Sequence, residues 1–253
     1  MEAIKFNLSG PTAFFKKPDV NSYAYFTYNN IHKIALLGIL GSIIGLKGYN
    51  QQKSIDTYPE FYDKLKTLKI SIVPKSKTGY FTKKFQTFTN NTGFYNIDIN
   101  KRPCTLVYRE QWLENVSWDI YILLDENSVD KKILNKLKDY LLNKKCHFIP
   151  YLGKNDHTAD ITNVELINLK AIQAHEKLIR IQSLFLTDNF NITGEKHSPN
   201  ERLIILKEML PTELDEFDNS YRFSNLSFTN LIVQPNTSKT LIYQDSLSNL
   251  YFF

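Results

Sequence analysis

The hydrophobic positions of the first half alternate between strand and helix spacing. Residues 3–8 alternate apolar and polar side chains, which predicts a strand, and Ser9-Gly10-Pro11 predicts its end. Residues 31–46 are mostly apolar and predict a helix, for which Asn29 or Asn30 is the expected cap.

The middle of the chain predicts a further strand, a long hairpin and a second helix. A strand is expected over residues 68–74. Aromatic residues and threonines alternate over residues 79–101 around Asn90-Asn91-Thr92-Gly93, which is typical of a hairpin. Further strands are expected over 105–108 and 118–124, followed by an amphipathic helix that Ser128 caps and that ends near Leu142.

After Pro150 the pattern becomes strand-rich and irregular. The expected strands cover residues 161–169, 178–186, 203–209, 221–233 and 240–243. The order of elements before Pro150 resembles a ferredoxin-like unit with an elongated hairpin inserted. We therefore predict an α+β protein with a ferredoxin-like domain at residues 1–150, whose hairpin lies at about 79–101, and a smaller β-rich domain at residues 151–253.

Four glycines of the first predicted helix, or just beyond it, form a stripe. At 100° per residue they fall within a sector of roughly 80°. Each costs a helix about 1 kcal/mol relative to alanine, which suggests that another group approaches closely there. Either RNA or a neighbouring subunit lies against the stripe, or the helix packs tightly on a sheet. The glycines are Gly38, Gly41, Gly45 and Gly48.

Composition indicates an ordinary soluble protein with an unusual aromatic content. Of 253 residues, 42% are hydrophobic and 23% charged, and 15 Tyr with 17 Phe favour many strands. Two cysteines, Cys104 and Cys146, are too few for a disulfide framework or a thiolate metal site. The N-terminal residues do not form a signal peptide, and the longest apolar run is too short to span a bilayer. We expect a cytoplasmic protein without a membrane partner.

The net charge of +5 is unevenly distributed. Residues 64–97 contain seven lysines and no acidic residue, with six aromatic residues interleaved toward the end. Because lysines neutralise phosphates and aromatic faces accept unstacked bases, this segment predicts a hairpin that grips single-stranded RNA. The other interpretation is an exposed hairpin whose lysines face water above buried rings.

Candidate RNA-binding residues follow from this pattern and from a second basic cluster beside Phe14 and Phe15. The candidates for phosphate contact are Lys16, Lys17, Lys75, Lys77, Lys83, Lys84, Lys101 and Arg102. The candidates for base stacking are Tyr80, Phe81 and Phe85. The hairpin loop, residues 90–94, is an alternative contact for a neighbouring subunit.

Candidate catalytic groups are few. The five histidines are dispersed, without metal-ligand spacing, and there is no Gly-x-Ser-x-Gly motif. Tyr28, His32 and Lys33 form the set that acid–base cleavage of RNA would use, although a histidine at a helix start is more often a cap or an interface residue. We predict no catalytic residue, no metal and no cofactor.

Three stretches of the chain form motifs: residues 10–18 after the first predicted strand, residues 36–45 in the glycine-rich first helix, and residues 150–156, followed by Ala159, in a turn. They resemble the opening motif, the first helix and the turn that ends the first domain in the Cas-five family of CRISPR-associated proteins. Many members begin that helix with prolines, where this chain has Asn29-Asn30-Ile31-His32.

The resemblance implies an RRM-like domain with a thumb-like hairpin and a β-rich second domain. It also implies a Cascade surveillance complex in which the chain holds the 5′ handle of the CRISPR RNA (crRNA) and contacts the backbone and large subunits, with target DNA reached indirectly. Length and composition most resemble the type I-B branch, where a separate subunit cuts the RNA. The alternatives are a metal-free endoribonuclease of repeat RNA and a protein scaffold without RNA contact.

Overall fold

The computed structural model describes residues 1–19, 23–91, 105–172, 178–196, 200–237, 240, 242–246 and 248–253. These residues form a mixed α and β protein that is rich in strands and has few helices. None of the helices they form has the length and apolar character needed to cross a membrane.

The described residues build a main sheet of five antiparallel strands. β1 (Glu2–Ala13) and β4 (Thr105–Leu123) lie at its centre, between β2 (Ile70–Pro74) and β5 (Asp160–Asn168), in the order β2-β4-β1-β5. β3 (Lys83–Asn91) pairs with the outer half of β4. One part of β4 therefore pairs within the sheet with β1 and β2, and its other part forms a hairpin with β3.

β1 continues past Ser9-Gly10-Pro11, so the predicted break is wrong. The pairing of β1 with β4 keeps its register from Gly10–Val116 to Thr12–Glu114. On the other side of β1 the pairing with β5 ends at Ser9, so Pro11 lies where no second ladder needs its missing N–H. The two strands expected over 105–108 and 118–124 are likewise one strand, β4.

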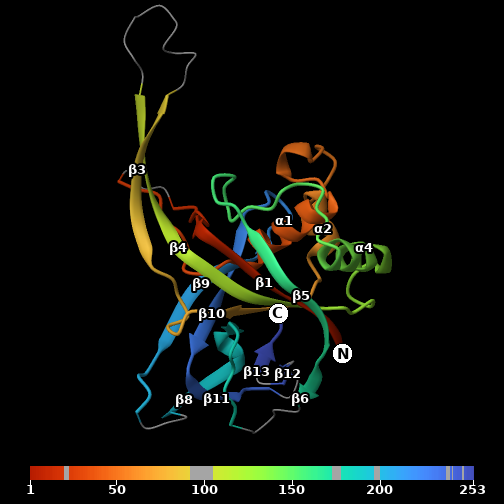
Figure 1. Cartoon of the computed structure of the whole chain (residues 1–253), viewed down its shortest axis with the longest axis vertical. Coiled ribbons are helices and arrows are strands. Elements are labelled where there is room, and N and C mark those ends of the chain that lie inside the picture. Colours follow the sequence, from red (N-terminus) through yellow and green to blue (C-terminus); the bar gives the residue numbers. More distant parts are fainter. Residues whose placement is uncertain are drawn as a thin grey trace, which may run out of the picture.

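The hairpin differs from the one predicted within residues 79–101. Its strands are β3 and residues 105–113 of β4, and the residues between them, 92–104, lie outside the described part of the chain. These paired strands project from the body as a two-stranded arm (Figure 1). We use "the arm" for this pair.

The α-helices of the described residues gather on one side of the main sheet (Figure 1), and two short 3-10 helices, η1 (Tyr49–Gln51) and η2 (Thr187–Asn189), lie in the connections. The α-helices are α1 (Lys33–Ile44), α2 (Glu60–Leu65), which the sequence pattern did not predict, and α4 (Lys131–Leu142). The predicted caps are wrong. The Nδ1 atom of His32 accepts the Ala35 N–H at 3.2 Å to begin α1, and Asp130 begins α4.

The glycine stripe serves packing within the fold, although against α2 and a loop rather than a sheet. A Cβ on Gly41 would lie 2.6 Å from the Cβ of Phe61, whereas one on Gly38 would lie at an ordinary 3.9 Å from the Phe61 ring. Gly45 ends α1 with a φ of 79° and lies against His147. Both its left-handed backbone conformation and the lack of space for a Cβ therefore favour glycine there. Gly48 faces open space.

The principal core lies between the main sheet and the helices and continues into the residues after β5. Ile4, Phe6 and Leu8 of β1 are fully buried in it with the apolar residues of α1. The opposite face of the sheet is polar at its centre, where Asn7 Nδ2 donates to Asp119 Oδ1 at 3.0 Å. The alternation of apolar and polar residues along β1 therefore has a direct structural cause.

The residues after β5 form small sheets below the main sheet (Figure 1). Their strand orders are β7-β10-β9, β11-β8 and β13-β12-β6. The strands are β6 (Lys170–Ile172), β7 (Phe185–Leu186), β8 (Phe190–Lys196), β9 (Ile205–Leu214), β10 (Tyr221–Thr229), β11 (Leu231–Pro235), β12 (Ile242–Asp245) and β13 (Ser248–Tyr251). β5 lies beyond residue 150 and still belongs to the main sheet, so that sheet crosses the predicted domain boundary.

Candidate nucleic-acid interface

The segment around Tyr25 widens the base of the arm. The Tyr25 N–H donates to the Arg109 carbonyl and the Gln111 N–H donates to the Tyr25 carbonyl, both at 2.9 Å. Tyr25 thus lies in parallel beside Glu110, where β4 has already left its pairing with β1. This attachment fixes the Tyr25 ring at one face of the arm.

Four partly exposed aromatic rings continue along that face. The ring centroids of Tyr25 and Tyr108 are 6.2 Å apart, those of Tyr108 and Phe88 are 5.7 Å apart, and those of Phe88 and Trp112 are 6.3 Å apart. Phe88 and Tyr108 are direct cross-strand partners with nearly parallel rings. We call Tyr25, Tyr108, Phe88 and Trp112 the aromatic row.

Two lysines lie over the aromatic row. The Nζ atom of Lys16 is 3.9 Å from the centroid of the Tyr25 ring, and the Nζ atom of Lys154 is 5.3 Å from that of Phe88. Lys16 is exposed. Rings that accept bases and cations that attract phosphates are the two components of a single-strand binding surface.

Glu110 orients the inner end of the aromatic row. Its carboxylate is buried, and its two oxygens lie 3.0 and 3.1 Å from the Nζ atom of Lys154. The Trp112 Nε1–H donates to the same carboxylate at 2.8 Å. One buried acid therefore fixes both a cation and a ring of this surface.

Two of the three stretches that resemble family motifs, residues 10–18 and 150–156, contact each other. The Phe14 N–H donates to the Leu152 carbonyl at 3.0 Å. A Cβ on Gly153, whose φ is 92°, would lie 1.9 Å from the Phe14 oxygen, so only glycine fits. The turn at 151–158 is further attached by His157, whose Nδ1 atom lies 2.7 Å from the Thr12 hydroxyl. Burial and, secondarily, the charge of Lys154 lower the pKa of His157.

A cleft of about 1330 Å³ opens beside the aromatic row. Lys16, Glu110 and Lys154 line it at the arm, and α1 forms its floor through Ala35 and Gly38. Its opposite wall is the loop that contains the exposed side chains Phe148, Ile149 and Tyr151. The cleft and the aromatic row meet at Lys16 and Lys154, which line the cleft and also lie over rings of the row. The two features therefore form one continuous surface.

Three of the six described lysines that were predicted to contact phosphate form ion pairs. The Nζ–oxygen distances are 3.3 Å for Lys17 and Glu208, 2.9 Å for Lys75 and Asp119, and 3.0 Å for Lys84 and Glu114. Burial lowers the pKa of Lys83, although the nearby charge of Glu208 opposes this shift. The segment without acids in the sequence therefore lies among acids from β4 and β9.

The structure shows no ion pair for the other residues that were predicted to contact phosphate and that it describes. Lys77 is exposed and has no ion pair within the described residues. Lys101 and Arg102 lie outside those residues. Of the predicted set, Lys16 lies over the aromatic row, and Lys84 lies on the same face of the arm, opposite Trp112 and paired with Glu114.

The predicted stacking residues lie apart from one another. Phe81 is 7% exposed and its ring packs edge-on against Trp118 at 5.0 Å, so the prediction that it stacks on a base is corrected by its place in the core. Tyr80 is 47% exposed. Phe85 is 53% exposed on the arm face opposite to the aromatic row, where its ring meets Phe26 edge-on at 6.0 Å.

The sequence pattern missed the aromatic row and Lys154 as site residues. Part of the aromatic row could have been found from the sequence. Phe88 lies four residues after Lys84, a predicted site residue, so alternation places both side chains on one face of β3. Recognising the partners on β4 requires the register that pairs Phe88 with Tyr108 and Lys84 with Trp112.

The set considered for catalysis is enclosed. The centroids of Tyr28 and His32 are 5.4 Å apart, but burial lowers the pKa of His32 to about 3 and its Nδ1 atom serves as the helix cap. Burial lowers the pKa of Lys33 to about 8, and its Nζ atom lies 6.0 Å from the centroid of the Phe253 ring. Among the described residues no group of three or more His, Cys, Asp or Glu side chains is arranged to hold a metal ion.

Comparison with known proteins places the chain in a family. A model of the family described as CRISPR-associated protein (Cas_Cas5) matches residues 3–231. The chain therefore belongs to the Cas5 family of CRISPR-associated proteins. No curated protein matches the sequence.

Two solved structures share the fold. A CRISPR protein from Archaeoglobus fulgidus is similar with a TM-score of 0.51 and 12% identity, over 99% of this chain and 98% of that one. A chain of a CRISPR RNA-guided surveillance complex is similar with a TM-score of 0.50 and 13% identity, over 92% of this chain and 91% of that one. These likenesses agree with the α+β class predicted from the sequence.

Proposed function

We propose that this chain is a non-catalytic RNA-binding subunit of a type I CRISPR surveillance complex, where it holds the 5′ handle of the crRNA. The observation that carries this proposal is the aromatic row with Lys16 and Lys154 beside the cleft. Stacking is sequence-tolerant because every base has a π-face, and the exposed cation of Lys16 attracts the backbone of the same strand. Lys154 is paired with Glu110, so its role is to hold the inner end of the aromatic row in place.

The assembly is proposed from the family and from the fold. The backbone subunit and the large subunit are the proposed protein partners, target DNA is reached indirectly, and the cytoplasm is the proposed location. Membership of the Cas5 family and the likeness to a chain of an RNA-guided surveillance complex support this assignment. The type I-B branch remains our proposal for the subtype, because it rests on length and composition.

The finer description of the fold is also proposed. The order β2-β4-β1-β5, with α1 after β1 and α4 after β4, supports a ferredoxin-like, RRM-like unit whose arm is the thumb. Residues 151–253 are proposed as a second, β-rich domain that gives β5 to the first sheet.

The non-catalytic part of the proposal concerns Tyr28, His32 and Lys33. With a pKa of about 3, the buried imidazole of His32 is neutral at pH 7, and its Nδ1 atom is engaged in the cap. We propose that His32 is structural. His32→Asn retains a good capping side chain, so mature RNA should be unchanged in cells carrying the whole system. Accumulation of unprocessed precursor RNA would support the endoribonuclease instead.

The RNA-binding proposal is tested on the assembled complex. The tagged chain is expressed with the other CRISPR-associated proteins and the repeat array of its own genome, and the co-purifying RNA is sequenced. We expect RNAs with one repeat-derived 5′ end, and a much lower RNA occupancy when Phe88 and Tyr108 are both changed to Ala. An assembly that contains the protein partners and no RNA would favour the scaffold alternative.

A further inference from the structure

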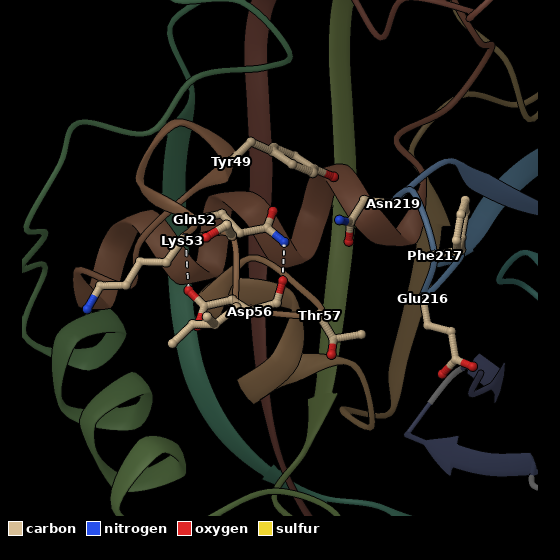
Figure 2. A pocket seen from close by; sticks show the side chains of 10 residues that line it. Tyr49, Gln52, Lys53, Asp56, Thr57, Glu216, Phe217 and Asn219 are labelled. Carbon is tan, nitrogen blue, oxygen red and sulfur yellow. Dashed lines mark hydrogen bonds between the residues drawn. The ribbon is translucent and has the colours of Figure 1, made fainter.

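The structure has a second hollow, of about 500 Å³ (Figure 2). One side is the loop of residues 49–57, which follows α1, and the other is the turn that joins β9 to β10. Tyr49, Gln52, Lys53 and Asp56 lie on the first side, and Phe217 on the second (Figure 2). No residue of the aromatic row takes part in it.

Two large apolar side chains border this hollow and are almost completely exposed. Phe217 is 95% exposed, and Ile55, from the opposite loop, is 84% exposed. Single exposed apolar residues are common on protein surfaces, but two that frame one concave site match the central anchors of protein interfaces.

Hydrogen bonds hold the turn that presents Phe217. Asp215 Oδ1 accepts the Phe217 N–H at 2.9 Å, and Asp215 Oδ2 accepts hydrogen bonds from Arg222 Nε and Nη2 at 2.9 and 2.6 Å. Asn219 closes the turn with a φ of 58°. The aromatic side chain is therefore held out to solvent by a backbone that loses little entropy on binding.

The opposite loop is fixed in a similar way. Asp56 Oδ2 accepts the Lys53 N–H at 2.9 Å, and Gln52 Nε2 donates to the Asp56 carbonyl at 2.9 Å (Figure 2). Both walls of the hollow are thus ordered before any partner arrives.

The charge around the hollow is acidic. Glu216 and Asp56 line it against a single cation, Lys53. Glu213 and Asp218, both exposed, lie on the same turn or next to it. A nucleic acid would be repelled here, whereas a protein segment with basic side chains would be attracted.

We propose that this hollow docks a neighbouring protein chain of the same assembly, through an apolar side chain of that chain flanked by lysine or arginine. The apolar side chain fills the space between Ile55 and Phe217, and the basic groups pair with Glu216 and Asp56. The inference rests on the proposed function for the identity of the assembly. It concerns a different surface from the aromatic row, none of whose residues lines the hollow, although Tyr49 borders both the hollow and the cleft.

Photo-crosslinking identifies the occupant. The full chain carrying p-benzoylphenylalanine in place of Phe217 is assembled with the CRISPR-associated proteins and repeat array of its genome, irradiated, and analysed by peptide mass spectrometry. We expect one crosslinked peptide from another subunit, with an apolar residue beside lysine or arginine. A crosslink to RNA, a crosslink to a second copy of this chain, or no crosslink in a complex that contains RNA would overturn the docking proposal alone. A preparation that contains no RNA would contradict the proposed function instead.

Substitutions test the energetics. Phe217→Ser should weaken retention of the crosslinked subunit about 30-fold, the effect of removing an interface anchor. Leu203→Ser is the control, since Leu203 is 51% exposed and lies outside the hollow. Glu216→Lys should also weaken retention, with the larger loss at low salt. Unchanged retention in Phe217→Ser and Glu216→Lys would contradict the proposal, and neither change removes a buried group.

Discussion

The carboxylate of Glu110 and the ammonium group of Lys154 form a two-oxygen ion pair across 44 residues of sequence, with Nζ–oxygen distances of 3.0 and 3.1 Å. Glu110 is buried, whereas the Lys154 side chain is 32% exposed. The pair joins the arm to the turn after Pro150, and it fixes Trp112 through the same carboxylate.

Lys154→Met should destabilise the fold, because it leaves a buried carboxylate without its cation. We expect a loss of about 1–3 kcal/mol in the free energy of unfolding, less than for a fully buried pair since Lys154 is partly exposed. Urea denaturation measures it. The double variant Glu110→Gln/Lys154→Met should regain most of the loss, since Gln still accepts from Trp112. Equal stability of Lys154→Met and the parent would contradict this account.

The glycines of α1 should respond to alanine with opposite signs. Gly41→Ala places a Cβ 2.6 Å from the Cβ of Phe61, so it should destabilise by about 1–3 kcal/mol. Gly38→Ala meets only an ordinary contact at 3.9 Å, and its higher helix propensity should stabilise by up to about 1 kcal/mol. Denaturation of the two variants gives the comparison. Equal shifts would show that Phe61 does not restrict the helix.

Lys33 should make stability depend on alkaline pH. Burial, followed by the charge of Lys69, lowers its pKa from 10.5 to about 8, so the unfolded chain binds this proton more tightly than the folded chain. The contribution of Lys33 to the free energy of unfolding should therefore be lowest below pH 8 and should rise from pH 8 to 10.5. Lys33→Met should be more stable at pH 7, by up to about 3 kcal/mol, and should lose this rise.

The Lys33 prediction is checked by urea denaturation at pH 7, 8, 9 and 10. Lys132→Met, at an exposed position on α4, is the control and should keep the parent's profile. A Lys33→Met profile parallel to that of the parent would show that another group causes the dependence.

The lysines should differ in their effect on the salt dependence of RNA binding. Lys16→Met should reduce the slope of log affinity against log salt by about 0.7, as expected for one single-strand phosphate contact. Lys75→Met should change it much less, because the Lys75 cation is already paired with Asp119. Fluorescence titrations with a single-stranded repeat RNA, over a range of salt concentrations, measure both slopes. Equal slopes for the two variants would remove Lys16 from the interface.

Local sequence patterns predicted most of the elements that build the main sheet. Alternation identified β1 and β2, and helical periodicity identified α4, because an element that is buried on one side has apolar residues at that element's own spacing. The long apolar run of residues 31–46 identified α1, which is buried on nearly all sides. The boundaries were less accurate. Pro11 suggested an end to β1, although its position beside an unpaired edge allows the strand to continue.

The site was less predictable because its partners are distant in sequence. Residues 64–97 contain no acid, yet Glu114 and Glu208 neutralise or approach lysines of that segment. Phe81 belongs to an aromatic run and is buried against Trp118. Trp112 and Lys154 become neighbours of Phe88 only once the register of the arm and the fold of the turn after Pro150 are known.

The affinity of the Tyr108→Ala variant for single-stranded RNA tests the central claim most directly. Tyr108 lies in the middle of the aromatic row, in contact with Tyr25 and Phe88, and it is not part of the buried core. Fluorescence anisotropy with a labelled handle oligonucleotide should show binding weaker by about 1–3 kcal/mol, or roughly 5- to 150-fold, with an unchanged salt slope. Val107→Ser, on the opposite face of the arm, should bind like the parent. A Tyr108→Ala variant that is folded and binds RNA as tightly as the parent would contradict the account.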